Sequence, residues 1–223
     1  MKAFFVNGSP RKNWNTHKML ESAMKGASDA GAECELVHLY DYSYKGCVSC
    51  FACKLKNAKT NGVCAYRDDL RPVLEKAVAS DVIVMGSPIY FSYPTGMLRS
   101  FMERLLFPVM TYSTDENGKP IRAFDRKIYT ATILTMNCPE ELAWKIGYLT
   151  LFEANAFGLG HVMGYTETLC AYDTLQFTDY SRYEANNFDG NAKKKHQEEH
   201  FAVDLQNAYD LGKRLVMKAK EQE

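Results

Sequence analysis

Hydroxyl, amide and basic side chains gather in one short loop near the start of the chain. The apolar run of residues 3–6 ends at Asn7-Gly8, and a helical pattern begins near residue 15. The first N–H groups of a helix lack partners within the helix, and its dipole favours negative charge at that end. We therefore expect the loop to bind a phosphate group through five side chains: Ser9, Arg11, Asn13, Asn15 and Thr16.

The residue spacing excludes two common phosphate-binding loops. A Walker loop needs Gly-Lys-Ser/Thr at a fixed distance, and none follows Gly8. The Gly-x-Gly-x-x-Gly of dinucleotide-binding folds is missing as well. A loop of Ser, Thr and Asn at a first βα turn suits a monophosphate bound without metal. The simpler alternative is an ordinary strand–turn–helix with a capping Ser or Asn.

A second loop, at residues 86–96, combines two prolines with three aromatic side chains and Gly96. Proline fixes its own backbone angle, so the two prolines hold the loop in a defined path. We expect a flat ring to bind here, with backbone groups at its edge, against Pro88, Ile89, Tyr90 and Phe91. The alternative is that these aromatic side chains only fill a core.

Four cysteines lie close together in the irregular stretch of residues 40–67. Their spacing is Cys47-x-x-Cys50-x-x-Cys53, with Cys64 following Gly62. Thiolates at such steps can converge on one iron–sulfur centre. A zinc site is a second interpretation, although closed Cys₄ zinc sites more often use paired Cys-x-x-Cys units. Free thiols, or a thiol–disulfide pair, are the third.

Strand and helix patterns alternate along the whole chain. We expect strands at 2–7, 33–39, 81–86, 127–136 and 161–169, and helices at 15–30, 69–80, 95–107, 139–157 and 193–222. The unbroken apolar run at 81–86 is typical of a buried parallel strand. This order predicts one domain, 1–223, of the α/β class: an open, doubly wound, five-stranded parallel sheet with helices on both faces. Ligands of such folds lie outside the carboxyl ends of the strands, so the loops after the first, third and fourth strands should form the site.

Charge and composition exclude some classes of partner. The 27 basic and 27 acidic residues cancel, which argues against general nucleic-acid binding. No apolar run approaches the roughly 20 residues of a membrane span, and residues 1–5 lack a signal-peptide layout. We therefore expect a cytoplasmic protein without membrane contact. The Lys193-Lys194-Lys195 run is expected to be a solvated helix start.

The two loops together carry a resemblance to a known family. Gly8-Ser9-Pro10-Arg11 with Asn15-Thr16, and Gly86-Ser87-Pro88-Ile89-Tyr90-Phe91 with Gly96, resemble the NAD(P)H-dependent FMN reductases and iron–sulfur flavoproteins of the flavodoxin-like superfamily. The resemblance runs in order over most of the chain and is weakest at residues 108–126. It implies a flavodoxin-like fold, bound FMN and NAD(P)H as reductant.

The same resemblance implies a [4Fe-4S] cluster on Cys47, Cys50, Cys53 and Cys64. The chain departs from the family there, because ten residues separate Cys53 from Cys64 and the insert is rich in lysine. The implied activity is an FMN-dependent NAD(P)H oxidoreductase of the flavin or quinone type, acting on a small-molecule acceptor or a redox protein. The flavin itself carries the redox chemistry, so no catalytic side chain is assigned. The alternative is a non-enzymatic electron carrier, which the cysteines favour and the neutral charge disfavours.

Residues 171–192 are too aromatic for a solvated linker and too irregular for a core. Aromatic residues are enriched at protein interfaces, and related flavoproteins form dimers or tetramers. We therefore expect a homodimer or homotetramer, with this segment and residues 108–124 packing against a neighbour. Tyr172 and Asp173 are expected to reach the flavin. The alternative is that the segment folds back over its own sheet edge.

Overall fold

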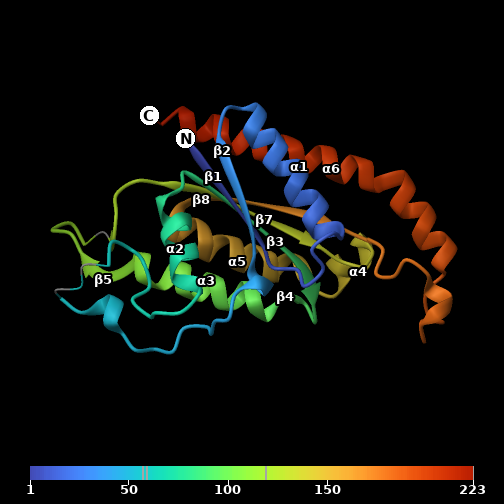
Figure 1. Ribbon diagram of the computed structural model, residues 1–223, viewed down its shortest axis with the longest axis horizontal. Helices are drawn as coiled ribbons and strands as arrows, with labels where there is room; N and C mark the ends of the chain where they lie inside the picture. Colours follow the sequence, from blue (N-terminus) through green and yellow to red (C-terminus); the bar gives the residue numbers. More distant parts are fainter. Residues whose placement is uncertain (57, 59, 119, 223) are drawn as a thin grey trace.

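A parallel sheet of five strands forms the centre of the molecule (Figure 1). The computed structural model describes residues 1–56, 58, 60–118 and 120–222. The strand order is β2-β1-β3-β7-β8, the order of flavodoxin-like sheets. The strands are β1 (Lys2–Asn7), β2 (Glu33–His38), β3 (Val82–Tyr90), β7 (Ile128–Thr135) and β8 (Gly164–Ala171). The short β4 (Tyr93–Pro94) pairs antiparallel with the end of β3.

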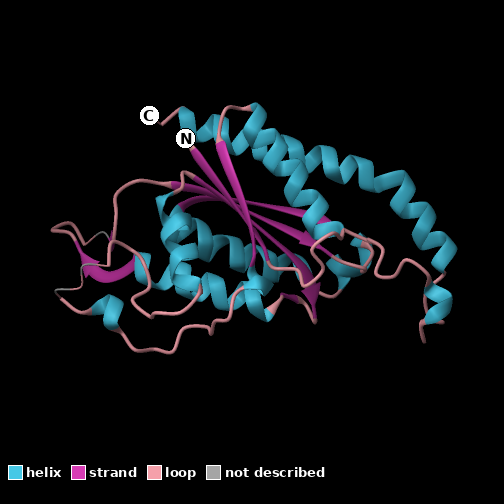
Figure 2. Cartoon of the chain, viewed as in Figure 1, coloured by secondary structure: helices cyan, strands magenta, loops and turns pink. Residues whose placement is uncertain are grey.

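Helices cover both faces of this sheet (Figure 2). One face packs against α1 (Asn15–Asp29) and α6 (Gly190–Lys220), and the other against α2 (Leu70–Ala79), α3 (Gly96–Val109) and α5 (Tyr148–Met163). The short α4 (Glu140–Lys145) packs beside α5. Alternation along β1 explains the two cores: Phe4 and Val6 face one layer, while Ala3 and Phe5 face the other. The doubly wound α/β prediction is therefore confirmed.

Two predicted boundaries in the second half of the chain are wrong. The helix expected at 139–157 is two helices, because Gly147 adopts a left-handed φ of 84° between α4 and α5. The strand expected at 161–169 begins only at Gly164, whose φ of 106° ends α5. Residues 161–163 are helical instead. Glycine adopts such angles without steric cost, and both turns depend on it.

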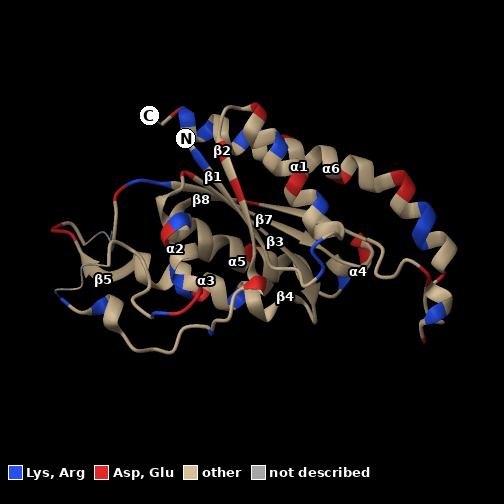
Figure 3. Cartoon of the chain, in the orientation of Figure 1, with Lys and Arg blue, Asp and Glu red and all other residues tan. Residues whose placement is uncertain are grey.

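Residues 108–126, where the family resemblance is weakest, include a small hairpin that is separate from the main sheet. Strand β5 (Met110–Thr114) pairs antiparallel with β6 (Pro120–Arg122), while residue 119 lies outside the described residues. The described residues also form three short 3₁₀ turns: η1 (Leu39–Asp41), η2 (Ala52–Lys54) and η3 (Tyr180–Arg182). Acidic and basic side chains are interspersed along α6, in keeping with the zero net charge (Figure 3). Within the described part of the chain, no helix has the length and apolar character needed to cross a bilayer.

Candidate cofactor site

A cavity of about 150 Å³ lies where β1, β3 and β7 end. It joins the two loops that the sequence singles out and the segments after β7 and β8. Its walls comprise Ser9, Arg11, Trp14, Asn15, Thr16, Pro88, Ile89, Tyr90, Thr135, Met136, Asn137, Thr174, Leu175 and Gln176. The carboxyl-end rule for α/β sheets thus locates the cavity.

Local hydrogen bonds fix the loop after β1. The backbone N–H of Ser9 donates to Asn7 Oδ1 at 2.9 Å, and the Arg11 N–H donates to Ser9 Oγ at 3.1 Å. Gly8 has no room for a side chain, because a Cβ there would lie 2.8 Å from the Cβ of Leu98 and 3.1 Å from the Gly86 carbonyl. The loop is therefore held tightly against the middle of β3 and the beginning of α3.

A strap after β8, residues 174–176, lies over this loop. Trp14 Nε1 and Asn15 Nδ2 both donate to the Leu175 carbonyl, each at 2.9 Å. The Arg11 guanidinium donates to the Gln176 carbonyl at 2.5 Å. The residue types at 174–176 did not mark them as site residues in the sequence. They lie at the cavity because they follow β8, whose carboxyl end is at the same edge of the sheet.

Polar groups after β7 complete the cavity wall. Thr16 Oγ1 and Thr135 Oγ1 are 2.8 Å apart, so the loops after β1 and β7 share a buried hydroxyl pair. Asn137 donates through Nδ2 to Gln176 Oε1 at 3.2 Å, while its Oδ1 is buried without a partner among the described residues. An unpartnered buried acceptor is costly, and a bound ligand with a donor would satisfy it.

Four of the expected contact residues do not line this cavity. Asn13 is exposed on the outer side of its loop. Phe91 is 99% exposed, because it occupies the left-handed tip (φ 48°) of the β3–β4 turn. Tyr172 faces the opposite side of its chain segment and packs near Phe152, where burial raises its pKa. Asp173 turns toward α6.

The residues that line the cavity fit a flavin mononucleotide. Ser9, Asn15 and Thr16 are polar and more than nine-tenths buried, which suits a desolvated phosphate at one end. Pro88, Ile89 and the half-exposed Tyr90 offer an apolar surface to a flat ring at the other. The Asn137 Oδ1 atom adds an acceptor without a partner among the described residues.

The four clustered cysteines surround a second, smaller cavity of about 20 Å³. Cys47, Cys50, Cys53 and Cys64 all contribute to its wall. Burial raises the pKa of the Cys53 thiol. The donor chemistry fits an iron–sulfur centre, but the side chains do not converge: the described residues present no three His, Cys, Asp or Glu that could share a metal ion. No step is therefore derived through such a centre.

One buried arginine ties the cysteine segment to α3. Arg104 is 1% exposed, and its guanidinium forms a two-pronged ion pair with Asp68. It also donates to the carbonyls of Lys45 and Tyr66, both at 3.1 Å. Burial opposes its charge, but the hydrogen bond to Asp68 raises the pKa of Arg104 above its ordinary value. Arg104 thus holds both arms of the segment, before Cys47 and after Cys64.

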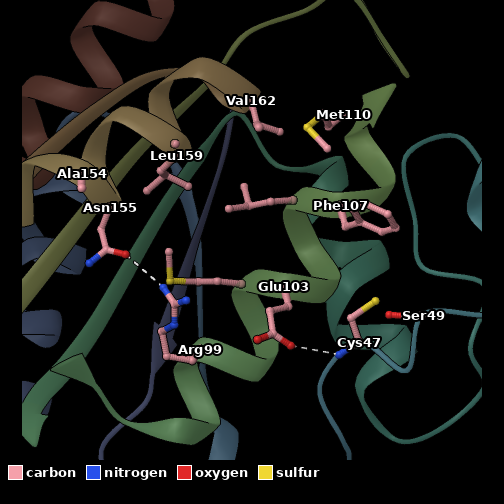
Figure 4. A pocket seen from close by; sticks show the side chains of 13 residues that line it. Cys47, Ser49, Arg99, Glu103, Phe107, Met110, Ala154, Asn155, Leu159 and Val162 are labelled. Carbon is pink, nitrogen blue, oxygen red and sulfur yellow. Dashed lines mark hydrogen bonds between the residues drawn. The ribbon is translucent and has the colours of Figure 1, made fainter. Parts of the chain in front are cut away.

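A further cavity of about 440 Å³ is separate from the candidate cofactor site. It is an apolar groove between α3 and α5 (Figure 4). Arg99 donates to Asn155 Oδ1 at 3.0 Å across the groove, and Glu103 accepts from the Cys47 N–H at 3.1 Å. None of the predicted FMN contacts lines it. Size alone therefore does not mark the cofactor site.

Comparisons with known proteins point to the same kind of cofactor. A model of the family described as NADPH-dependent FMN reductase matches residues 1–132. An iron-sulfur flavoprotein of Archaeoglobus fulgidus is 39% identical over 104 residues, which cover 47% of this chain and 48% of that protein. One of Clostridioides difficile is 30% identical over 128 residues, which cover 53% and 56%. The chain thus aligns with about half the length of these curated relatives.

Solved structures show the same fold over almost the whole chain. The NAD(P)H:quinone oxidoreductase from Methanothermobacter marburgensis superimposes with a TM-score of 0.68 at 14% identity, covering 96% of this chain and 98% of that one. A flavodoxin from the domain Archaea covers 99% of both chains, with a TM-score of 0.51 at 14% identity. The fold is flavodoxin-like, and since the family match spans more than half of its length, the chain belongs to the NADPH-dependent FMN reductase family.

Proposed function

We propose that the protein is an FMN-dependent oxidoreductase that takes electrons from NAD(P)H and passes them to a second acceptor, of the flavin or quinone type. The observation that carries this proposal is the single cavity shared by the phosphate-type loop and the aromatic loop. Bound FMN would supply the redox chemistry, accepting a hydride and releasing electrons in a second half-reaction. The protein would supply binding, orientation and electrostatics.

In this proposal, different residues of the cavity bind the phosphate, orient the ring and exclude water. Ser9 and Thr16 provide hydroxyl donors, and α1 directs its free N–H groups toward the phosphate. Pro88 and Ile89 orient the ring, while the strap at 174–176 excludes water from the phosphate end. Tyr90 is half-exposed at the rim, on the side from which a nicotinamide could approach.

Anaerobic stopped-flow spectroscopy tests the reductase activity. We expect FMN to co-purify, and NADPH or NADH to bleach its absorbance within the turnover time. Reduction by neither nicotinamide, with fast reduction by a ferredoxin-type donor, would instead establish the electron-carrier alternative. Protein without flavin that also fails to bind added FMN would refute both.

A [4Fe-4S] cluster on the four cysteines is the second part of the proposal. It is supported by their common cavity and by the names of the relatives, which are iron-sulfur flavoproteins. Because the thiols do not converge as they lie, the segment would have to rearrange and bring them together to bind iron. Iron and acid-labile sulfide assays after anaerobic reconstitution test it. Four of each per chain support the cluster, and absence of both leaves the free-thiol or zinc interpretations.

We also propose that the protein is a homodimer, with the groove between α3 and α5 facing a second copy. Helix α5 is apolar on most sides, yet Phe157 is 76% exposed and Leu149 lies at the surface. By contrast, the aromatic rings of residues 171–192 contact one another, with Phe177 stacked on Tyr183 at 4.0 Å. These rings therefore pack within the segment, although Tyr183 remains 52% exposed.

Light scattering at micromolar concentration tests the assembly. We expect a mass near twice the 25.3 kDa of the chain. Ala154→Arg places a charge in the apolar groove and should give a monomer that keeps its flavin. A monomeric wild type would contradict the dimer, and a variant that stays dimeric would move the interface elsewhere.

A further inference from the structure

A buried cation supports the cavity wall from the last helix. The sequence suggests that Lys193 begins a solvated run of three lysines. In the structure it is buried instead, with only 7% of its surface exposed. Its Nζ donates to the Asn137 carbonyl at 2.6 Å and forms an ion pair with Asp173. Asp173 has a left-handed φ of 53° and donates its N–H to the Cys138 carbonyl at 3.0 Å. Such a conformation is strained for a non-glycine residue and persists where its surroundings enforce it.

The two charges of the Lys193–Asp173 pair contact the cavity wall differently. Asn137, which Lys193 contacts, lines the cavity, whereas Asp173 does not. Neither charged side chain lines the cavity itself, but Lys193 Nζ contacts a lining residue directly, whereas the Asp173 carboxylate contacts Lys193 and His196. His196 Nδ1 approaches the second oxygen of Asp173 at 3.6 Å, which helps to hold the carboxylate in place.

We propose that Lys193 is a positioning residue that also raises the reduction potential of the bound flavin, an inference that rests on the proposed FMN function. Hydride transfer from NAD(P)H adds two electrons and one proton to the flavin, so the reduced ring gains one negative charge unless a second proton follows. A cation in hydrogen-bond contact with the cavity wall favours that added charge, because a partly buried site screens it less than bulk water does. Lys193 also fixes Asn137, whose Oδ1 is left available for the ligand.

Two substitutions at the pair separate charge from structure. Lys193→Met removes the cation and leaves Asp173, so the potential should fall. Asp173→Asn removes the carboxylate and leaves the cation, so the potential should rise. A role limited to shaping the wall would weaken oxidised and reduced FMN alike, and would leave the potential unchanged. We expect each substitution to change the ratio of the affinities for reduced and oxidised FMN about tenfold. For a two-electron couple this corresponds to about 30 mV in the midpoint potential.

The measurement is the midpoint potential of the holoprotein, by reductive titration against a reference dye at pH 7. Lys195→Met is the matched control, because Lys195 lies on the same helix with its side chain 75% exposed. Opposite shifts in the two pair variants, with none in the control, support the inference. If both variants shift the potential in the same direction, or neither shifts it, the inference is overturned. If Lys193→Met does not fold, Asp173→Asn alone decides, because it must raise the potential. Wild-type protein without FMN would instead refute the proposed function.

Discussion

At the scale of single residues, Arg11 connects the phosphate-type loop to the strap. Its guanidinium holds the Gln176 carbonyl and also lines the cavity. A charge-assisted hydrogen bond is worth about 1.5–3 kcal/mol, so Arg11→Ala should weaken FMN binding about 10–150-fold. Fluorescence titration of apoprotein measures the affinity. A change within about twofold would mean that backbone N–H groups and hydroxyls bind the phosphate without Arg11.

Arg104 and Asp68 form the most deeply buried ion pair described in the molecule, with side chains 1% and 14% exposed. Removal of one partner leaves an uncompensated charge, so Arg104→Met should lower the free energy of unfolding by about 3–5 kcal/mol. The double variant Arg104→Met/Asp68→Leu should regain much of that loss. Arg71→Met, in the exposed pair with Glu75, is the control and should cost less than about 1 kcal/mol. Denaturant unfolding curves give all four values, and equal costs for the two single variants would contradict the assignment.

The sequence identified some residues of the candidate site and missed others. Ser9, Thr16 and Pro88 were identifiable because their residue types match a phosphate or a ring and they follow strands. Lys193 was not: a run of three lysines indicates a solvated face, and its burial depends on contacts with Asp173 and Asn137, which are twenty or more positions away. Contacts between distant parts of the chain leave no local pattern.

At the scale of elements, α1 and α6 cross so closely that two glycines are required. A Cβ on Gly212 would overlap the Ala23 carbonyl, and one on Gly26 would overlap the Tyr209 carbonyl. Gly212→Ala should therefore lower the free energy of unfolding by about 1–3 kcal/mol, because the helices must separate. Gly158→Ala is the matched control in α5, where nothing lies within 4 Å of the added carbon. It should be neutral or stabilising, since alanine favours helix by about 1 kcal/mol. Equal losses in both would contradict the close crossing.

The edge strand β8 is tied to α6 by Glu167 and Arg214, whose closest N–O distance is 2.7 Å. Burial works against the Glu167 charge, but hydrogen bonds from Arg214 and Tyr165 lower its pKa overall. A lowered pKa in the folded state stabilises the protein above the unfolded value of about 4.3, and this stabilisation is lost as the pH falls through the folded pKa.

Glu167→Gln should therefore destabilise the protein at pH 7 and much less near pH 3. The expected loss at pH 7 is only about 0.5–1 kcal/mol, because Arg214 is 46% exposed. Thermal unfolding of both proteins across this pH range measures the difference. Glu199→Gln, in an exposed pair with Lys195, is the control. A loss that is constant with pH would show that the carboxylate charge is not its cause.

Element boundaries were the weaker part of the sequence-based account. The apolar pattern of residues 139–157 is continuous, and one glycine costs a helix only about 1 kcal/mol, so the pattern could not show the break at Gly147. The strand after it was placed three residues too early for the same reason, since Gly164 ends α5. The order of strands and helices was predictable because buried parallel strands and amphipathic helices have different periods.

At the scale of the whole molecule, the candidate cofactor site draws on both halves of the chain. The family match ends at residue 132, yet Thr135, Asn137 and the strap at 174–176 line the same cavity. Helix α6 supports them, because Gln197 accepts from the Leu175 N–H at 3.1 Å and Lys193 holds Asn137. The second half thus builds the wall opposite the two loops that carry the resemblance.

The central claim is that this cavity binds FMN by its phosphate as well as its ring. Titration of the apoprotein with FMN and with riboflavin, followed by flavin fluorescence, tests it most directly, because riboflavin lacks only the phosphate. We predict tight, one-to-one binding of FMN and binding of riboflavin weaker by at least about tenfold, the loss of one or more charge-assisted hydrogen bonds. Equal affinity for the two flavins, or binding of neither, would contradict the account.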